Sequence, residues 1–170
     1  SGRLGLVEFR AFDMPPHARM NMTQMLLNRA LIAKFWREPY QHNLVRWGTE
    51  LHDQFMLAHY IEQDLRDVVE DLHQAGYPFD MAWLAPFFEF RFPRYGTVNL
   101  RGIELEVRMA LEPWHVLGEE VTGVGSTRYV DSSVERVQIK VNGLNDARYV
   151  VACNGHRIPL RPTGTYGEYV

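Results

Sequence analysis

The chain has 170 residues, 46% of them hydrophobic and 23% charged, which is the composition of an ordinary soluble globular protein. A net charge of -3 without a cluster of Lys and Arg argues against a nucleic-acid partner, and no apolar run approaches the ~18 residues that span a membrane. The single Cys153 excludes an internal disulfide, so we expect a cytoplasmic protein. Because Ser1-Gly2 stands directly before a predicted strand and no Met precedes it, we also expect a fragment of a longer chain.

The chain opens on a predicted strand over residues 6–12. Alternate residues of a strand point to the same face, so Glu8 and Arg10 should stand side by side as a polar pair. The bulky Phe9 and Phe12 predict that this strand is buried. A buried carboxylate and guanidinium would need a reason, such as binding a metal ion and an anionic substrate.

Helical spacing of apolar residues dominates the following segments. It predicts helices over residues 22–36 and 58–75, the second of which should stop at Gly76. Asp80 is the expected N-cap of a short third helical turn. Residues 87–92 are then predicted to form a strand.

The apolar period changes to two in the second half of the chain. Residues 98–107 alternate around Arg101-Gly102 and predict a hairpin, and residues 137–141 predict a further strand. Asn154-Gly155 accepts the positive φ angles of a type I′ turn and predicts another hairpin. Residues 118–127 show no period and are expected to form a loop.

These patterns predict an α+β fold. We expect residues 1–95 to form the strand and about three helices, and residues 96–170 to form an antiparallel β module of sandwich or meander type.

Three Glu-x-Arg motifs lie on strand-like sequence. An Arg can hold a carboxylate or phosphate in two-point contact, and a neighbouring Glu can coordinate Mg²⁺ or neutralise the Arg. Weak ion pairing on an exposed face explains the same spacing. The motifs are Glu8-Phe9-Arg10, Glu89-Phe90-Arg91 and Glu106-Val107-Arg108.

Two further groups of residues could contact a ligand. If Thr49 caps a helix, His52 and His59 lie two turns apart on one face. His52 with Arg46 and Asp53 nearby could move a proton or bind an anion, although a hydrogen-bonded structural histidine is the favoured interpretation. Trp114 and His115 follow Pro113 in a stiffened loop that could contact a substrate, or Trp114 could fill a gap between the two halves.

A family resemblance rests on several motifs in chain order, namely Val7–Met20, Arg46–Thr49, Leu51–Asp53, Phe55–Leu57, Glu89–Pro93, Leu111–Glu120 and Tyr129–Arg136. They resemble the C-terminal region of large bacterial proteins that join a transglutaminase-like domain to a long domain of unknown function. The resemblance covers most of the chain. The long domain is in turn similar to carboxylate-amine ligases of the glutamine synthetase and glutamate-cysteine ligase fold.

That resemblance implies a site in which Mg-ATP activates a substrate carboxylate as an acyl phosphate, which an amine then attacks. Arg10 would stabilise the negative charge, Glu8 would hold Mg²⁺ or orient Arg10, and His52 would transfer a proton. The remaining metal ligands of the ligase site would lie upstream, and the upstream transglutaminase-like and ligase-like regions would be the partners of this chain. No cofactor is therefore expected to bind tightly to this chain, and the chain alone should not turn over.

A non-catalytic function stays open at this point. The chain could be an accessory module that positions the transglutaminase-like domain or binds a peptide substrate along an exposed sheet edge. An unpaired edge in the β half, with Glu8 and Arg10 buried against each other, would favour that function.

Overall fold

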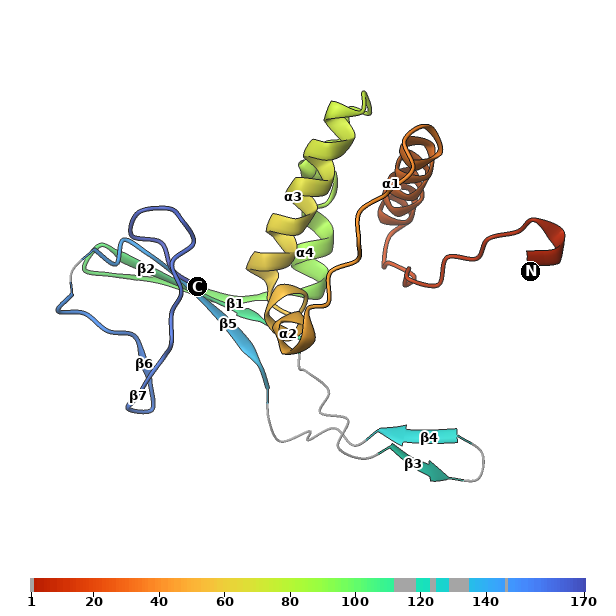
Figure 1. Cartoon of the computed structure of the whole chain (residues 1–170). Helices are drawn as coiled ribbons and strands as arrows, with labels where there is room; N and C mark the ends of the chain where they lie inside the picture. The colour runs from red at the N-terminus through yellow and green to blue at the C-terminus, as the bar shows by residue number, and fades with distance from the viewer. Residues whose placement is uncertain (1, 112–118, 123–124, 129–134, 146) are drawn as a thin grey trace. The chain divides into compact units, whose positions relative to one another are not determined.

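The computed structural model describes residues 2–111, 119–122, 125–128, 135–145 and 147–170 (Figure 1). The fold is α+β, as the sequence predicts. The helices are α1 (Ala18–Arg37), α2 (Leu51–Gln54), α3 (Ala58–Gln74) and α4 (Ala85–Arg91), with 3₁₀ turns at Gly2–Leu4, Gly48–Glu50 and Met81–Trp83. The strands are β1 (Arg94–Leu100), β2 (Ile103–Met109), β3 (Glu119–Thr122), β4 (Gly125–Arg128), β5 (Val137–Asn142), β6 (Ala152–Cys153) and β7 (His156–Arg157).

The chain divides into two compact units. Unit 1 comprises residues 1–45 and 65–87, and unit 2 comprises residues 46–64 and 88–170. The predicted division into residues 1–95 and 96–170 differs from these two units, and it stays a prediction. None of the helices in the described part of the chain is both long and apolar enough to cross a membrane.

The predicted helices are confirmed, and unit 1 contains α1 and the part of α3 from Leu65 onwards. Helix α1 contains the predicted segment 22–36 and begins earlier, where the Nδ1 atom of His17 accepts a hydrogen bond of 3.1 Å from the Arg19 amide. An ion pair between Lys34 and Asp71 joins α1 to α3. The core of this unit consists of Met20, Ala30, Val69, Leu72, Phe79 and Leu84.

The predicted stops and caps of the helical segment are also confirmed. After α3, Gly76 has a φ of +84° and Tyr77 donates a backbone hydrogen bond of 2.8 Å to the Leu72 carbonyl. The Asp80 side chain accepts a bond of 2.9 Å from the Ala82 amide and so caps the following 3₁₀ turn.

The predicted opening strand is wrong. Residues 6–15 have no regular secondary structure, and the side chains of Leu6, Val7 and Phe9 are exposed. A strand needs a neighbour to pair its backbone groups, and no described segment pairs with these residues. Alternation alone therefore does not suffice to specify a strand here.

The predicted strand over residues 87–92 is a helix instead. Phe92 donates a backbone hydrogen bond of 2.8 Å to the Phe88 carbonyl, which is the spacing of one helical turn at the end of α4. Leu84, Phe88 and Phe92 recur every four residues, so one helical face carries them. The shorter alternation within Phe87-Phe88-Glu89-Phe90 conceals this helical period.

The main sheet of unit 2 is a three-stranded antiparallel meander in the order β1-β2-β5. Both predicted hairpins are confirmed, with positive φ angles at Arg101 (55°) and Gly102 (79°) and at Asn154 (49°) and Gly155 (81°). Within the segment expected to form a loop, β3 and β4 pair as a hairpin. The described residues of that segment therefore have regular structure.

The two faces of this sheet differ in polarity. Ile103, Leu105 and Val107 alternate along β2 with Glu104, Glu106 and Arg108, and the register aligns each set with like residues of β5. Val141, on the apolar side, is fully buried. The polar side carries the residues that line a cavity.

Gly143, directly after β5, is held against the β1–β2 turn. Its φ is +81°, and a Cβ atom at this position would lie 2.5 Å from the Gly102 carbonyl oxygen. Gly155 has the same φ of +81°, but a Cβ atom added there would meet no other atom within 4 Å.

We expect Gly143→Ala to lower the free energy of unfolding by more than Gly155→Ala. Both substitutions place a side chain in the left-handed region, at a cost of about 1–2 kcal/mol, but only the first adds a backbone clash. Urea denaturation followed by circular dichroism measures both values. Equal losses would show that the Gly102–Gly143 approach relaxes without cost.

Candidate functional site

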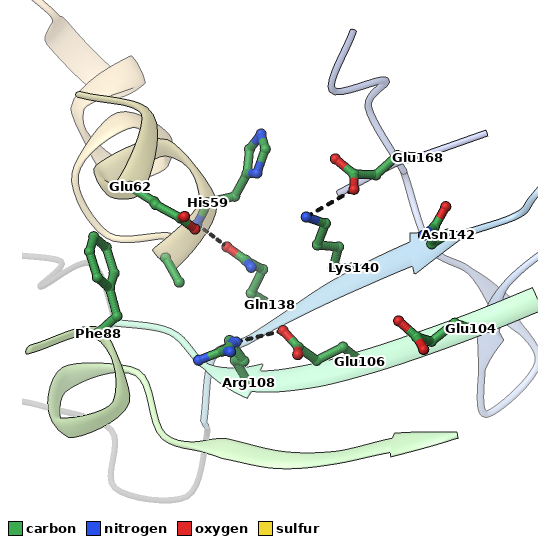
Figure 2. A pocket seen from close by; sticks show the side chains of 11 residues that line it. His59, Glu62, Phe88, Glu104, Glu106, Arg108, Gln138, Lys140, Asn142 and Glu168 are labelled. Carbon is green, nitrogen blue, oxygen red and sulfur yellow. Dashed lines mark hydrogen bonds and ion pairs between the residues drawn. The ribbon is translucent and has the colours of Figure 1, made fainter. Parts of the chain in front are cut away.

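Unit 2 contains a polar cavity of about 240 Å³ (Figure 2). The first turn of α3 contributes Ala58, His59 and Glu62, α4 contributes Phe88, and the C-terminal segment contributes Glu168. The remaining lining residues come from the polar side of β2 and β5. This is called the α3–sheet cavity below.

Three cross-strand pairs form the floor of the α3–sheet cavity. Arg108 lies opposite Gln138, Glu106 opposite Lys140, and Glu104 opposite Asn142. Figure 2 shows these side chains following one another along the two strands. Gln138 is only 5% exposed, whereas Glu104 and Asn142 are exposed, so the cavity runs from a buried end to an open end.

Ion pairs fix the buried end of the cavity. The Arg108 Nε atom lies 2.5 Å from Glu106 and its Nη1 atom lies 2.9 Å from Glu89 of α4. Arg94 of β1 contacts the same two carboxylates, at 3.2 Å for Glu89 and 3.3 Å for Glu106. These four residues, called the Glu89–Arg108 network below, alternate in charge and join α4 to β1 and β2.

The C-terminal segment supplies a second ion pair. Tyr169 exchanges two backbone hydrogen bonds with Val141, of 2.8 and 2.9 Å, which places the preceding residue beside β5. There Glu168 pairs with Lys140 at 3.0 Å and accepts a hydrogen bond of 2.8 Å from Thr163. Burial acts to raise the pKa of Glu168, but the hydrogen bonds from Lys140 and Thr163 outweigh it and hold that pKa below 4.5.

His59 is held in its neutral form at pH 7. Burial lowers its pKa below 6.5, and the Lys140 ammonium lowers it further, while Glu168 and Glu62 act in the opposite direction. Its backbone N–H donates a hydrogen bond of 2.8 Å to the Gln138 side-chain oxygen, which fixes the start of α3 above the sheet. Figure 2 shows no hydrogen bond between the imidazole ring and the other residues drawn, so none of these residues competes with a ligand for the ring nitrogens.

The charge of the α3–sheet cavity is unbalanced. Four carboxylates line it against two cations, which gives a net charge of 2 − 4 = −2 when His59 is neutral. The carboxylates are Glu62, Glu104, Glu106 and Glu168, and the cations are Arg108 and Lys140. This lining favours a positively charged ligand.

The predicted pair Glu8 and Arg10 forms, but on an exposed segment. Two contacts of 3.1 Å join the carboxylate to the guanidinium, and the two side chains are 62% and 82% exposed. The expectation that the pair is buried is therefore wrong. The roles proposed for Glu8 and Arg10 stay predictions.

The predicted long helix that would carry His52 and His59 is interrupted. Helix α2 ends at Gln54 and α3 begins at Ala58, so the two histidines belong to different helices. The His52 carbonyl accepts a hydrogen bond of 2.8 Å from Arg136, whose other terminal nitrogen lies 2.9 Å from Asp53. Neither His52 nor Arg46 lines the α3–sheet cavity.

Two other predicted substrate contacts, Trp114 and His115, lie outside the described residues. Their roles stay predictions. Among the residues that the structure does describe, no group of three or more His, Cys, Asp or Glu side chains is placed to hold a metal ion.

Sequence reasoning misses most of the cavity. The Glu-x-Arg motif marks Glu106 and Arg108, but no motif marks Glu62, Glu104 or Glu168. The available signal is that every second residue is polar in each of two segments, 104–108 in β2 and 138–142 in β5. The sequence does not say that these two rows pair, because β3 and β4 separate them along the chain.

The whole chain, residues 1–170, matches one protein family, described as "Putative amidoligase enzyme (DUF2126)". The chain belongs to this family. No curated protein and no solved structure matches the chain. Membership in the amidoligase family agrees with the ligase part of the sequence resemblance, while the transglutaminase-like parent stays a prediction.

The Glu89–Arg108 network predicts a specific pH dependence of stability. The hydrogen bond from Arg108 is the main reason why the pKa of Glu89 lies below its ordinary value of 4.5. A lowered folded-state pKa contributes stability above the unfolded value, and this contribution is lost as the pH falls through the folded-state pKa.

We expect Glu89→Gln to lower the free energy of unfolding at pH 7 by no more than about 1 kcal/mol, because the carboxylate is half exposed and water screens the pair. The difference from wild type should shrink as the pH falls below 4.5. Urea titrations at several pH values measure it, with Glu50→Gln as an exposed control in the same unit. A loss that is independent of pH would contradict the assignment of this stability to the carboxylate charge.

Proposed function

We propose that this chain contributes a substrate site to an ATP-dependent amide-forming ligase, and that the α3–sheet cavity is that site. The observation that carries the proposal is a neutral histidine in a cavity of net negative charge, in a chain of the amidoligase family. Amide formation needs an amine that has lost its proton. A neutral imidazole beside the substrate can accept that proton.

The proposed reaction has two steps. A substrate carboxylate oxygen attacks the γ-phosphorus of ATP, which releases ADP and forms an acyl phosphate. The amine nitrogen then attacks the acyl carbon, the bond from that carbon to the phosphate oxygen breaks, and inorganic phosphate leaves with the second proton that the nitrogen gives up. His59 takes a proton from the ammonium group before the attack, so that the nitrogen lone pair is free.

Mg-ATP is a substrate of the proposed reaction. The described residues offer no cluster of ligands for a resident metal ion, so no step is assigned to a metal bound by this chain. The upstream ligase-like and transglutaminase-like regions implied by the resemblance are the proposed partners that would complete the site.

Glu8 and Arg10 form a separate part of the proposal. Their two-point contact supports the role in which Glu8 orients the guanidinium, and the high exposure of Arg10 leaves it accessible to a phosphate or carboxylate. Because this pair belongs to unit 1 and the cavity to unit 2, each needs its own variant.

A peptide-binding accessory module is the alternative function, and one observation favours it. Within the described residues, β1 pairs only with β2, so its outer edge is unpaired. Such an edge can add a strand from an extended peptide. A buried Glu8–Arg10 pair would also favour the accessory module. These two residues do pair with each other, but both are exposed.

We expect His59→Gln to lower the rate of ADP release by about 10²-fold or more in the intact protein that contains this chain. The assay contains Mg-ATP with pooled carboxylates and amines. In the wild type the rate should rise with pH through the lowered pKa of His59, below pH 6.5, since only the neutral ring accepts a proton. The variant should lack this part of the pH profile.

The same assay separates the alternatives. Arg10→Ala is expected to lower ADP release as well. Full activity in that variant would show that Glu8 and Arg10 have no role in the reaction, and it would leave the role proposed for the cavity unchanged. An unchanged pH profile in His59→Gln would show that His59 is not the proton acceptor. If no mixture releases ADP and a labelled extended peptide binds the chain, the accessory module is the better description.

A further inference from the structure

Glu104 differs from the other carboxylates of the α3–sheet cavity. Glu106 contacts two guanidinium groups, Glu168 contacts Lys140, and Glu62 is also engaged in an interaction. Glu104 has neither a hydrogen bond nor an ion pair with any other residue drawn in Figure 2. A ligand can therefore neutralise its charge without breaking any contact drawn there.

The cation nearest to Glu104 in register is already engaged. Lys140 stands one pair along the ladder, opposite Glu106, yet it bonds Glu168 of the C-terminal segment at 3.0 Å. The residue directly opposite Glu104 is Asn142, whose amide carries both an acceptor and a donor. The open end of the cavity thus presents a carboxylate beside an amide, with a neutral imidazole among the other lining groups.

From this arrangement we infer that the α3–sheet cavity binds a primary ammonium group, with Glu104 as its anionic anchor and Asn142 as a second hydrogen-bonding partner. The inference rests on the proposed function in one respect, because it makes the bound amine the acyl acceptor. Of the two organic substrates, the amine enters this cavity and the carboxylate does not.

The size of the cavity restricts the ligand. A volume of about 240 Å³ lies below the ~300–1,000 Å³ of pockets for drug-sized molecules. A short aliphatic amine fits the cavity whole, and a longer substrate would enter with its amino end. Three ammonium protons match acceptors on the Glu104 carboxylate and the Asn142 amide oxygen.

Three probes of equal length test the charge preference. n-Butylamine, butan-1-ol and butyrate are titrated separately into the full chain at about 0.15 M salt, which suppresses non-specific attraction. Backbone amide NMR shifts report binding. We expect only n-butylamine to saturate, with shifts at residues 59, 104 and 142.

Two variants of opposite expected sign test the anchor. Glu104→Gln should weaken n-butylamine binding by about five- to ten-fold, the range for a partly exposed charge-assisted hydrogen bond. Lys140→Gln removes a cation and frees Glu168, so it should strengthen binding by about two- to five-fold. Glu50→Gln, an exposed carboxylate of unit 2 outside the cavity, should leave the affinity unchanged.

The outcomes separate this inference from the proposed function. Saturable n-butylamine binding that Glu104→Gln weakens supports the inference even if the intact protein never releases ADP. Amine-dependent ADP release whose KM for the amine is unchanged in Glu104→Gln supports the ligase and overturns the inference. Preferential binding of butyrate, or equal affinities in wild type and Glu104→Gln, also overturns it.

Discussion

Unit 2 depends on the Glu89–Arg108 network. Arg94 and Arg108 stand directly opposite each other on β1 and β2, an arrangement that is unfavourable for two like charges. Glu89 and Glu106 lie between them and contact both guanidinium groups. Arg108 and Glu106 are only 14% and 19% exposed, and removing either carboxylate would leave each guanidinium group with one partner in place of two. The network therefore specifies how α4 meets the sheet, and it fixes the buried end of the α3–sheet cavity.

The polarity of the sheet is the second constraint. A sheet covered by helices usually turns its apolar face towards them. Here the start of α3 lies over the polar face, held by the bond from the His59 amide to Gln138, while Val141 is buried on the other side. Polar side chains in such a position need partners, and most find them in one another. The space that remains between them is the cavity, and its charge follows from the surplus of carboxylates over cations.

The sequence predicts those features that local chemistry determines. Gly76 and Asp80 end and begin helical segments through their own backbone and side-chain bonds, and Asn154-Gly155 forms its turn without help from distant residues. The predictions for residues 6–12 and 87–92 fail because alternation of side chains is only half of a strand. The other half is a paired neighbour, which no described residue provides for the opening segment, while residues 87–91 satisfy their backbone within α4. The cavity escapes prediction for the same reason, since the pairing of β2 with β5 and the placing of Glu168 are long-range.

The three Glu-x-Arg motifs show why such a pattern does not define a site. Glu8 and Arg10 bond each other on an exposed segment, whereas Glu106 and Arg108 bond each other inside a network that also contains Glu89. In α4 the same spacing places Glu89 and Arg91 about 200° apart around the helix, so Glu89 turns to Arg94 and Arg108. A carboxylate is open to a ligand only when its neighbours have satisfied one another. In the α3–sheet cavity that condition is met at Glu104. It lies next to the Glu106–Lys140 pair along the polar side of β2 and β5, and both members of that pair have partners of opposite charge.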